Sequence, residues 1–133
     1  MGLVHAEIEL ANAREDSLSP MHVNALVDSG ALHLCIPQQV ASQLALPVLD
    51  RRQVTVADGQ THTVDYVGPV RIRFQNRQCL VGALVTGNET LLGAIPIEDM
   101  DVVIHPARQT LIVNPNSPNI AASLAMSFRT SHA

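Results

Sequence analysis

Short runs in which apolar and polar residues alternate constrain the fold of this chain more than any other feature. The clearest run is residues 4–10, where aliphatic side chains take turns with polar ones. Alternation of period two is typical of strands that bury one face. Further runs of strand length follow at 21–27, 31–36, 53–57, 61–67, 70–74, 78–85, 101–104 and 111–113. Turn-forming residues separate these runs roughly every eight to twelve residues, which favours an all-β sandwich or closed barrel.

One hairpin and one or two short helices are also predicted. Asp58-Gly59 lies between two of the runs and favours a tight turn in which both positions have positive φ. Pro37 precedes a stretch whose apolar residues share one side of a helix, so we expect a short helix at 38–44. Residues 97–100 are expected to form one further helical turn.

Composition limits the chain to one domain and argues against several functions. Of its 133 residues, 47% are hydrophobic but only 2% are aromatic, with no Trp, so the core must be aliphatic. We expect no nucleic-acid partner, because eight basic residues are outnumbered by twelve acids and exposed aromatic platforms are lacking. No apolar run reaches the roughly 20 residues that span a bilayer, so no membrane association is expected.

The ends of the chain and its cysteines complete this outline. The N-terminus lacks a signal-peptide pattern, so a cytoplasmic protein is expected. Cys35 and Cys79 are then expected to be buried thiols, although a disulfide stays open. Six dispersed histidines show no metal-ligand spacing, and neither a metal nor a cofactor is expected. Residues 1–113 should form the domain, followed by a tail at 114–133.

The tail begins with a linker-like Asn-Pro-Asn-Ser-Pro-Asn stretch. Ile120, Leu124 and Phe128 then lie four residues apart. The spacing is consistent with a short amphipathic helix, and a flexible terminus is the alternative.

The stretch around Asp28 is the most informative for function. Asp28 follows the apolar run Ala25-Leu26-Val27 and is followed at once by Ser29-Gly30-Ala31. A carboxylate beside a core is costly unless it is paired or hydrogen-bonded. Asp, Ser and Gly are also ordinary turn formers. These residues therefore form either a plain turn or a site that uses the acid.

Three motifs, in order and spacing, resemble those of the retropepsin-like aspartic peptidases of clan AA. They are Asp28-Ser29-Gly30-Ala31 after an apolar strand, the hairpin around Asp58-Gly59, and Leu91-Leu92-Gly93 before a short helix. The resemblance covers roughly residues 3–113 and extends to a single-domain prokaryotic branch, which has near counterparts of residues 93–101. It implies a closed acid-protease barrel with a flap hairpin at about residues 53–67.

The resemblance also implies a role for each motif residue. Asp28 would share one proton with a second carboxyl group about 3 Å away, so that the pair acts as both acid and base in peptide hydrolysis. Ser29 would hydrogen-bond across to its counterpart. Gly30 would let the backbone pack tightly, and Ala31 would leave room for substrate.

The chain carries only one such motif, because Asp16-Ser17 lacks the glycine and Asp58-Gly59 lacks the hydroxyl residue. A second subunit is therefore expected to supply the second Asp28, in a two-fold homodimer. The expected function is an aspartic endopeptidase acting on extended polypeptide, with Asp58 and Gly59 at the tip of the flap and Leu91, Leu92 and Gly93 supporting the active site. The alternative is a homodimeric module that binds peptides or supports assembly without cleaving them.

Other residues near these motifs have simpler interpretations. Strand alternation is expected to point His33 away from Asp28. Tyr66 is expected to pack in the ordinary way. An acidic cluster near the second helix is expected to be solvated rather than to bind a cation; its members are Glu98, Asp99 and Asp101.

Two further expectations concern contacts. Leu32-His33 and Ala94-Ile95 stand where viral members place charged residues, so the dimer contacts of those enzymes do not carry over. Leu32, Val56 and Leu92 are expected to line the subsites, which implies a preference for apolar substrate residues.

Overall fold

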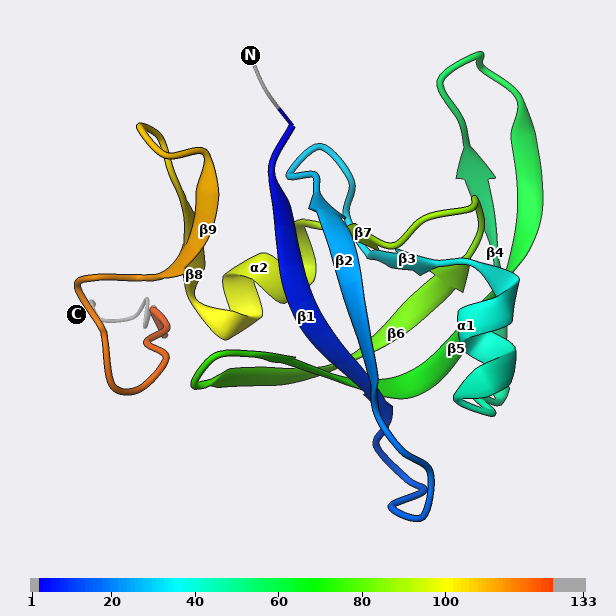
Figure 1. Cartoon of the computed structure of the whole chain (residues 1–133). Coiled ribbons are helices and arrows are strands. Elements are labelled where there is room, and N and C mark those ends of the chain that lie inside the picture. Colours follow the sequence, from blue (N-terminus) through cyan, green and yellow to red (C-terminus); the bar gives the residue numbers. More distant parts are fainter. Residues whose placement is uncertain (1–2, 126–133) are drawn as a thin grey trace, which may run out of the picture.

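Six strands close into a ring in the order β1-β2-β7-β3-β6-β5, because β5 returns to pair with β1 (Figure 1). The computed structural model describes residues 3–125. In chain order its elements are β1 (His5–Asn12), β2 (Met21–Val27), β3 (Leu34–Ile36), α1 (Gln38–Gln43), β4 (Val48–Thr55), β5 (Thr61–Phe74), β6 (Arg77–Val85), β7 (Leu91–Leu92), α2 (Ala94–Met100), β8 (Val102–His105) and β9 (Thr110–Val113). The predicted all-β closed barrel is confirmed.

The parallel pairings place β7 at the centre of the fold. β7 lies between β2, to which it is parallel, and β3, to which it is antiparallel. Leu26 pairs with Leu91 and Val27 with Leu92, so the end of β2 is joined to a strand far along the chain. This arrangement brings the first and third sequence motifs together.

β5 is one strand of 14 residues, whereas the alternation predicted separate strands at 61–67 and 70–74. Its first part pairs with β4 and residues 70–73 pair with β1. The change of partner falls where the register shifts between Val67 and Val70, at Gly68-Pro69. Pro69 has no N–H to donate, and a bulge is a position where a strand tolerates this.

The hairpin of β4 and β5 projects from the barrel, as predicted, but its arms and tip differ from expectation (Figure 1). β4 starts at Val48 rather than at residue 53, because its charged residues hide the alternation. At the tip, one backbone hydrogen bond joins the two arms: the Val56 N–H donates to the Gln60 carbonyl over 2.9 Å. Gly59 has φ +86° and Asp58 has no positive φ, so the turn is a three-residue type with glycine in the left-handed position.

The segment before β3 is a loop, whereas residues 31–36 were predicted to be a strand. Only Leu34–Ile36 is extended and paired. The Ala31 N–H donates to the Asp28 carbonyl over 3.1 Å, which turns the chain and delays the strand. Both predicted helices are present, and α2 begins three residues earlier than expected.

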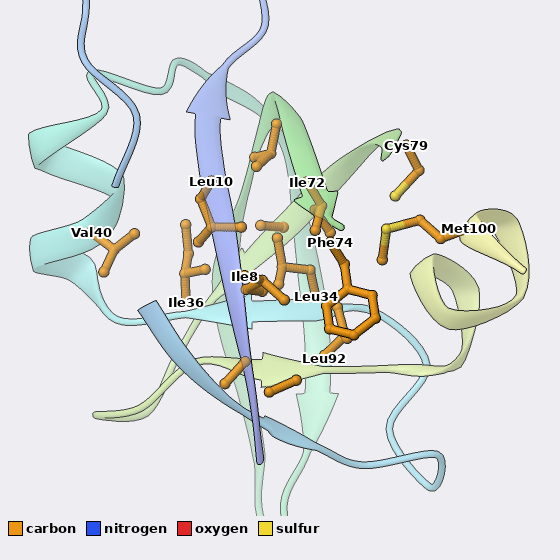
Figure 2. Close-up of a cluster of buried hydrophobic side chains, with 14 of the residues drawn as sticks. Ile8, Leu10, Leu34, Ile36, Val40, Ile72, Phe74, Cys79, Leu92 and Met100 are labelled. Atoms are coloured by element: carbon orange, nitrogen blue, oxygen red, sulfur yellow. The ribbon is translucent and has the colours of Figure 1, made fainter. Parts of the chain in front are cut away.

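The core fills the ring with aliphatic side chains, as the composition required. Figure 2 shows Ile8 and Leu10 of β1 beside Ile72 and Phe74 of β5, with Leu92 of β7 below them. Burying each of these side chains contributes roughly 1.5–3 kcal/mol relative to leaving it exposed. The strands that frame the site are therefore anchored in the main core.

β8 and β9 form a separate two-stranded sheet, and the chain then returns along α2. The carboxylate of Asp101, at the left-handed end of α2, accepts hydrogen bonds from the Asn114 amide (3.0 Å), the Ser117 hydroxyl and the Ala122 N–H (2.9 Å). Residues 114–125 contain no helix. Ile120 and Leu124 are exposed there, and Phe128 lies outside the described residues.

Candidate active site

Asp28 lies at the end of β2, where the barrel strand gives way to a loop. Its N–H donates to the Leu92 carbonyl over 3.0 Å, which continues the pairing of β2 with β7. Ala25 and Val27 are buried, so the strand that carries Asp28 is fixed by the core. The carboxylate itself is half-buried at the mouth of the barrel.

The loop after Asp28 holds one carboxylate oxygen. The Gly30 N–H donates to Asp28 Oδ1 over 2.9 Å, forming a local turn closed by the side chain. A Cβ on Gly30 would lie 3.2 Å from that oxygen, so glycine gives the carboxylate room. Within residues 3–125, Asp28 Oδ2 accepts no hydrogen bond and is open to a partner from outside.

The third motif supports this loop from behind. The Ala94 N–H donates to the Ala31 carbonyl over 2.8 Å, and the Ile95 N–H donates to the Leu32 carbonyl over 2.9 Å. A Cβ on Gly93 would lie only 2.3 Å from the His33 carbonyl oxygen. Glycine is therefore required where the start of α2 meets the loop.

A groove of about 620 Å³ runs beside the loop. One wall is residues 30–33 and the other is the hairpin arm at residues 53–56. The loop at 86–89 and three strand residues, Cys35, Leu84 and Leu91, complete the lining. The walls of the groove therefore come from a barrel loop and a projecting hairpin.

The predicted site residues fall into two groups. The residues of the first and third motifs lie together: Asp28, Ser29, Gly30, Ala31, Leu91, Leu92 and Gly93. Asp58 and Gly59 lie apart at the exposed hairpin tip and do not line the groove within this chain.

Of the residues expected to line subsites, the structure shows only which of them line the groove. Leu32 and Val56 line the groove. Leu92 does not, because it is fully buried in the core; its neighbour Leu91 faces the groove instead. Leu91 and Leu92 are consecutive in β7, so their side chains point to opposite faces of the strand. The sequence alone does not say which of the two faces the core.

The expected strand position of His33 is wrong, whereas its direction relative to Asp28 stays a prediction. His33 lies in the loop rather than on a strand, and its side chain lines the groove and makes an edge contact with Tyr66, with ring centroids 5.8 Å apart. The guanidinium carbon of Arg52 lies 4.1 Å from the centroid of the Tyr66 ring. Sequence reasoning missed this group because its members come from three separate segments.

The two cysteines are buried and free. Cys35 lines the groove, and burial followed by the negative charge of Asp28 raises its thiol pKa. Burial and the charge of Asp99 raise the pKa of Cys79 to about 12. Both side chains are therefore thiols rather than thiolates at neutral pH, which makes them poor nucleophiles.

Residues 3–125 contain no group of three or more His, Cys, Asp or Glu side chains placed to hold a metal ion. Over the same range, neither helix is long and apolar enough to cross a membrane.

Comparison with known proteins identifies the family. The model of the gag-polyprotein putative aspartyl protease family matches residues 19–95, which is more than half of the chain and includes the Asp28 loop, the hairpin and the Leu91-Leu92-Gly93 motif. No curated protein gives a significant match. The family match and the barrel agree with the resemblance seen in the sequence, and the chain belongs to the retropepsin-like gag-polyprotein aspartyl protease family.

Proposed function

We propose that the protein is an aspartic endopeptidase whose active site forms from the Asp28 residues of two subunits and cleaves polypeptide held in the groove. The family match supports a protease-type function. The observation that carries the finer proposal is the partly buried Asp28, whose carboxylate accepts a hydrogen bond from the Gly30 N–H on one oxygen and none on the other within residues 3–125, two residues before the groove wall at 30–33 begins.

The chemistry requires a second carboxyl group. Two carboxyl groups about 3 Å apart share one proton, so one takes a proton from water while the other gives one to the peptide carbonyl. The sequence contains one Asp-Ser-Gly-Ala motif. A two-fold axis beside Asp28 would supply the second carboxylate from an identical chain.

Two features support a dimer of this kind. The loop after β2, the start of β1 and the tip of the β8–β9 hairpin reach the same end of the molecule in Figure 1. Within residues 3–125, the outer edges of β8 and β9 pair with no other strand. An isolated two-stranded sheet is marginally stable, and its open edges are suited to pairing with a second copy.

The groove supports an extended peptide as substrate. β4 is the last strand of the sheet, so one of its edges is free along the described chain. A substrate strand can hydrogen-bond to such an edge while its side chains enter the groove. The aliphatic lining at Leu32, Val54 and Val56 favours apolar substrate residues.

The first experiment compares cleavage of a peptide library by the parent and Asp28→Asn. We expect Asp28→Asn to lose at least about 100-fold in kcat/KM, because an amide cannot act as acid and base. Asp16→Asn is the matched control, since Asp16 is exposed in another Asp-Ser sequence and should leave cleavage unchanged. Equal cleavage by the parent and Asp28→Asn would contradict the assignment. A parent that binds peptides without cleaving them would favour the non-catalytic module.

Mixing the two proteins tests the shared site. At equal amounts and equal dimer affinity, about one quarter of the dimers would carry two Asp28 residues. Activity per total parent chain should therefore fall by about half after subunit exchange. Activity that does not change on mixing would show that one chain holds a complete site.

A further inference from the structure

Tyr66 lies at the meeting point of three segments that are separate in the sequence. Its ring receives the guanidinium of Arg52 from β4, with 4.1 Å between the guanidinium carbon and the ring centroid. The imidazole of His33 makes an edge contact with it, at 5.8 Å between centroids and an interplanar angle of 68°. An arginine over an aromatic face and an edge-to-face aromatic pair are both attractive contacts. We name His33, Arg52 and Tyr66 the Tyr66 stack.

The Tyr66 stack joins the two walls of the groove. His33 is the last residue of the loop wall, and Arg52 directly precedes the hairpin wall at residues 53–56. Arg52 also pairs with Asp50 at the surface, with 3.0 Å between its Nε and Asp50 Oδ2. Arg52 and Tyr66 do not themselves line the groove, and the stack adjoins it through His33 and through the residue that follows Arg52.

Gly82 on β6 provides the surface on which the Tyr66 ring rests. A Cβ built on Gly82 would lie 2.1 Å from Tyr66 Cζ and 2.3 Å from its hydroxyl oxygen. The backbone of Gly82 does not have the positive φ that favours glycine. The need for glycine at position 82 therefore comes from the nearby Tyr66 ring and not from the backbone conformation of β6.

We propose that Tyr66 is a positioning residue that sets the width of the substrate groove, by holding Arg52 of the hairpin arm and His33 of the Asp28 loop on one ring that rests on Gly82. This inference rests on the proposed function, because it assigns the groove to substrate. The ring touches no reacting atom. It acts by fixing the distance between the two walls that bind the peptide.

The kinetic test uses variants at Tyr66. Tyr66→Phe keeps the ring and should keep KM within about twofold. Tyr66→Leu removes the aromatic face and should raise KM about three- to tenfold with a smaller change in kcat, because the groove binds the ground state as well as the transition state. A fall in kcat alone, or equal defects in both variants, would overturn the proposal.

A double-mutant cycle with Gly82 separates positioning from general damage. Gly82→Ala should raise KM in the parent, because the new methyl group displaces the ring. In a Tyr66→Ala background the same substitution should have little further effect, since no ring remains to be displaced. Gln78→Ala on the same strand is the control, because Gln78 is exposed and lines neither the groove nor the cavity that Tyr66 and Gly82 share. Additive effects of Gly82→Ala in both backgrounds would contradict a role through the ring.

Hydrogen exchange supplies a readout that does not depend on cleavage. We expect amides of residues 50–56 to exchange faster in Tyr66→Leu and Gly82→Ala than in the parent and Tyr66→Phe, while amides of β1 stay unchanged. Unchanged exchange in the hairpin would overturn the proposal even in an active enzyme. If the parent cleaves no peptide, the proposed function fails, and faster hairpin exchange would still support the positioning role.

Discussion

The Asp28 N–H donates to the Leu92 carbonyl over 3.0 Å, so the candidate catalytic residue is tied directly to a fully buried core residue. The side chain of Leu92 packs inside the ring while its backbone accepts a hydrogen bond from the candidate active-site loop. The conformation of this loop is therefore linked to the stability of the core.

Leu92→Ala should lower the free energy of unfolding by about 2–5 kcal/mol, because it leaves a cavity in a closed core. Urea unfolding of the parent and variant measures the change. Leu80→Ala is the control and should shift stability by no more than about 0.5 kcal/mol, since Leu80 is exposed. A Leu92→Ala loss as small as that of the control would show that β7 is not anchored as described.

Gly93→Ala should destabilise the protein by about 1–3 kcal/mol through overpacking. The backbone of Gly93 has φ −90°, which any residue adopts, so the cost comes from the 2.3 Å approach of the new Cβ to the His33 carbonyl oxygen. Thermal unfolding measures it. Gly87→Ala is the comparison that measures the cost of backbone strain alone. A Cβ at Gly87 would meet no atom within 4 Å, and only its φ of +76° is unfavourable for alanine.

Cleavage should depend on both protein concentration and pH. Specific activity should fall as the protein is diluted through the dimer dissociation constant, because a monomer would have half a site. The rate should rise on acidification from neutrality and then pass through a maximum, since the working pair holds one proton. Sedimentation and cleavage over the same concentrations check this. A monomer with a constant specific rate would rule out the shared pair.

The stability of the protein should also respond to His33. Burial, and then the positive charge of Arg52, lower the pKa of His33 below 6.5, so the unfolded chain binds this proton more readily than the folded one. The free energy of unfolding should therefore decline as pH falls through about 6.5 toward the lowered pKa. His33→Gln should remove this part of the decline in urea unfolding at a series of pH values. His62→Gln, at an exposed position, should leave the decline in place.

Asp101 should stabilise the segment at residues 114–122 against α2, and this stabilisation should be lost only at strongly acidic pH. Hydrogen bonds from Ser117, Asn114 and the Ala122 N–H lower its pKa from 3.8 to about 2. Its contribution is present above about pH 3.8 and is lost as pH falls toward about 2. Asp101→Asn should lower the melting temperature at neutral pH and flatten the acid decline. Asp16→Asn, at an exposed carboxylate, should do neither.

The all-β class and the strands with clear alternation could be predicted from the sequence, because period-two patterns report which face of a strand is buried. Residues 4–10 and 21–27 correspond to β1 and β2 for this reason. Alternation does not report a strand's partner. β5 continues across Gly68-Pro69 because β4 and β1 pair one after the other with the same edge of β5. The alternation therefore predicts two strands where the structure has one.

The candidate site was predictable only where its residues are adjacent in sequence. The Asp28 loop and the Leu91-Leu92-Gly93 segment have recognisable local motifs, and the structure brings them together. The contacts among His33, Arg52 and Tyr66 depend on tertiary packing of three segments. No local pattern reports such packing, and residues 31–33 form a loop instead of the predicted strand.

The direct pairing of β1 with β5 closes the ring without β4, the strand that contributes the hairpin wall of the groove. Insertions, deletions and substitutions in the projecting hairpin can therefore accumulate without opening the barrel. Under the proposed function, selection could change which polypeptides the groove binds while the folding of the ring stays the same. The architecture would then let specificity diverge separately from stability.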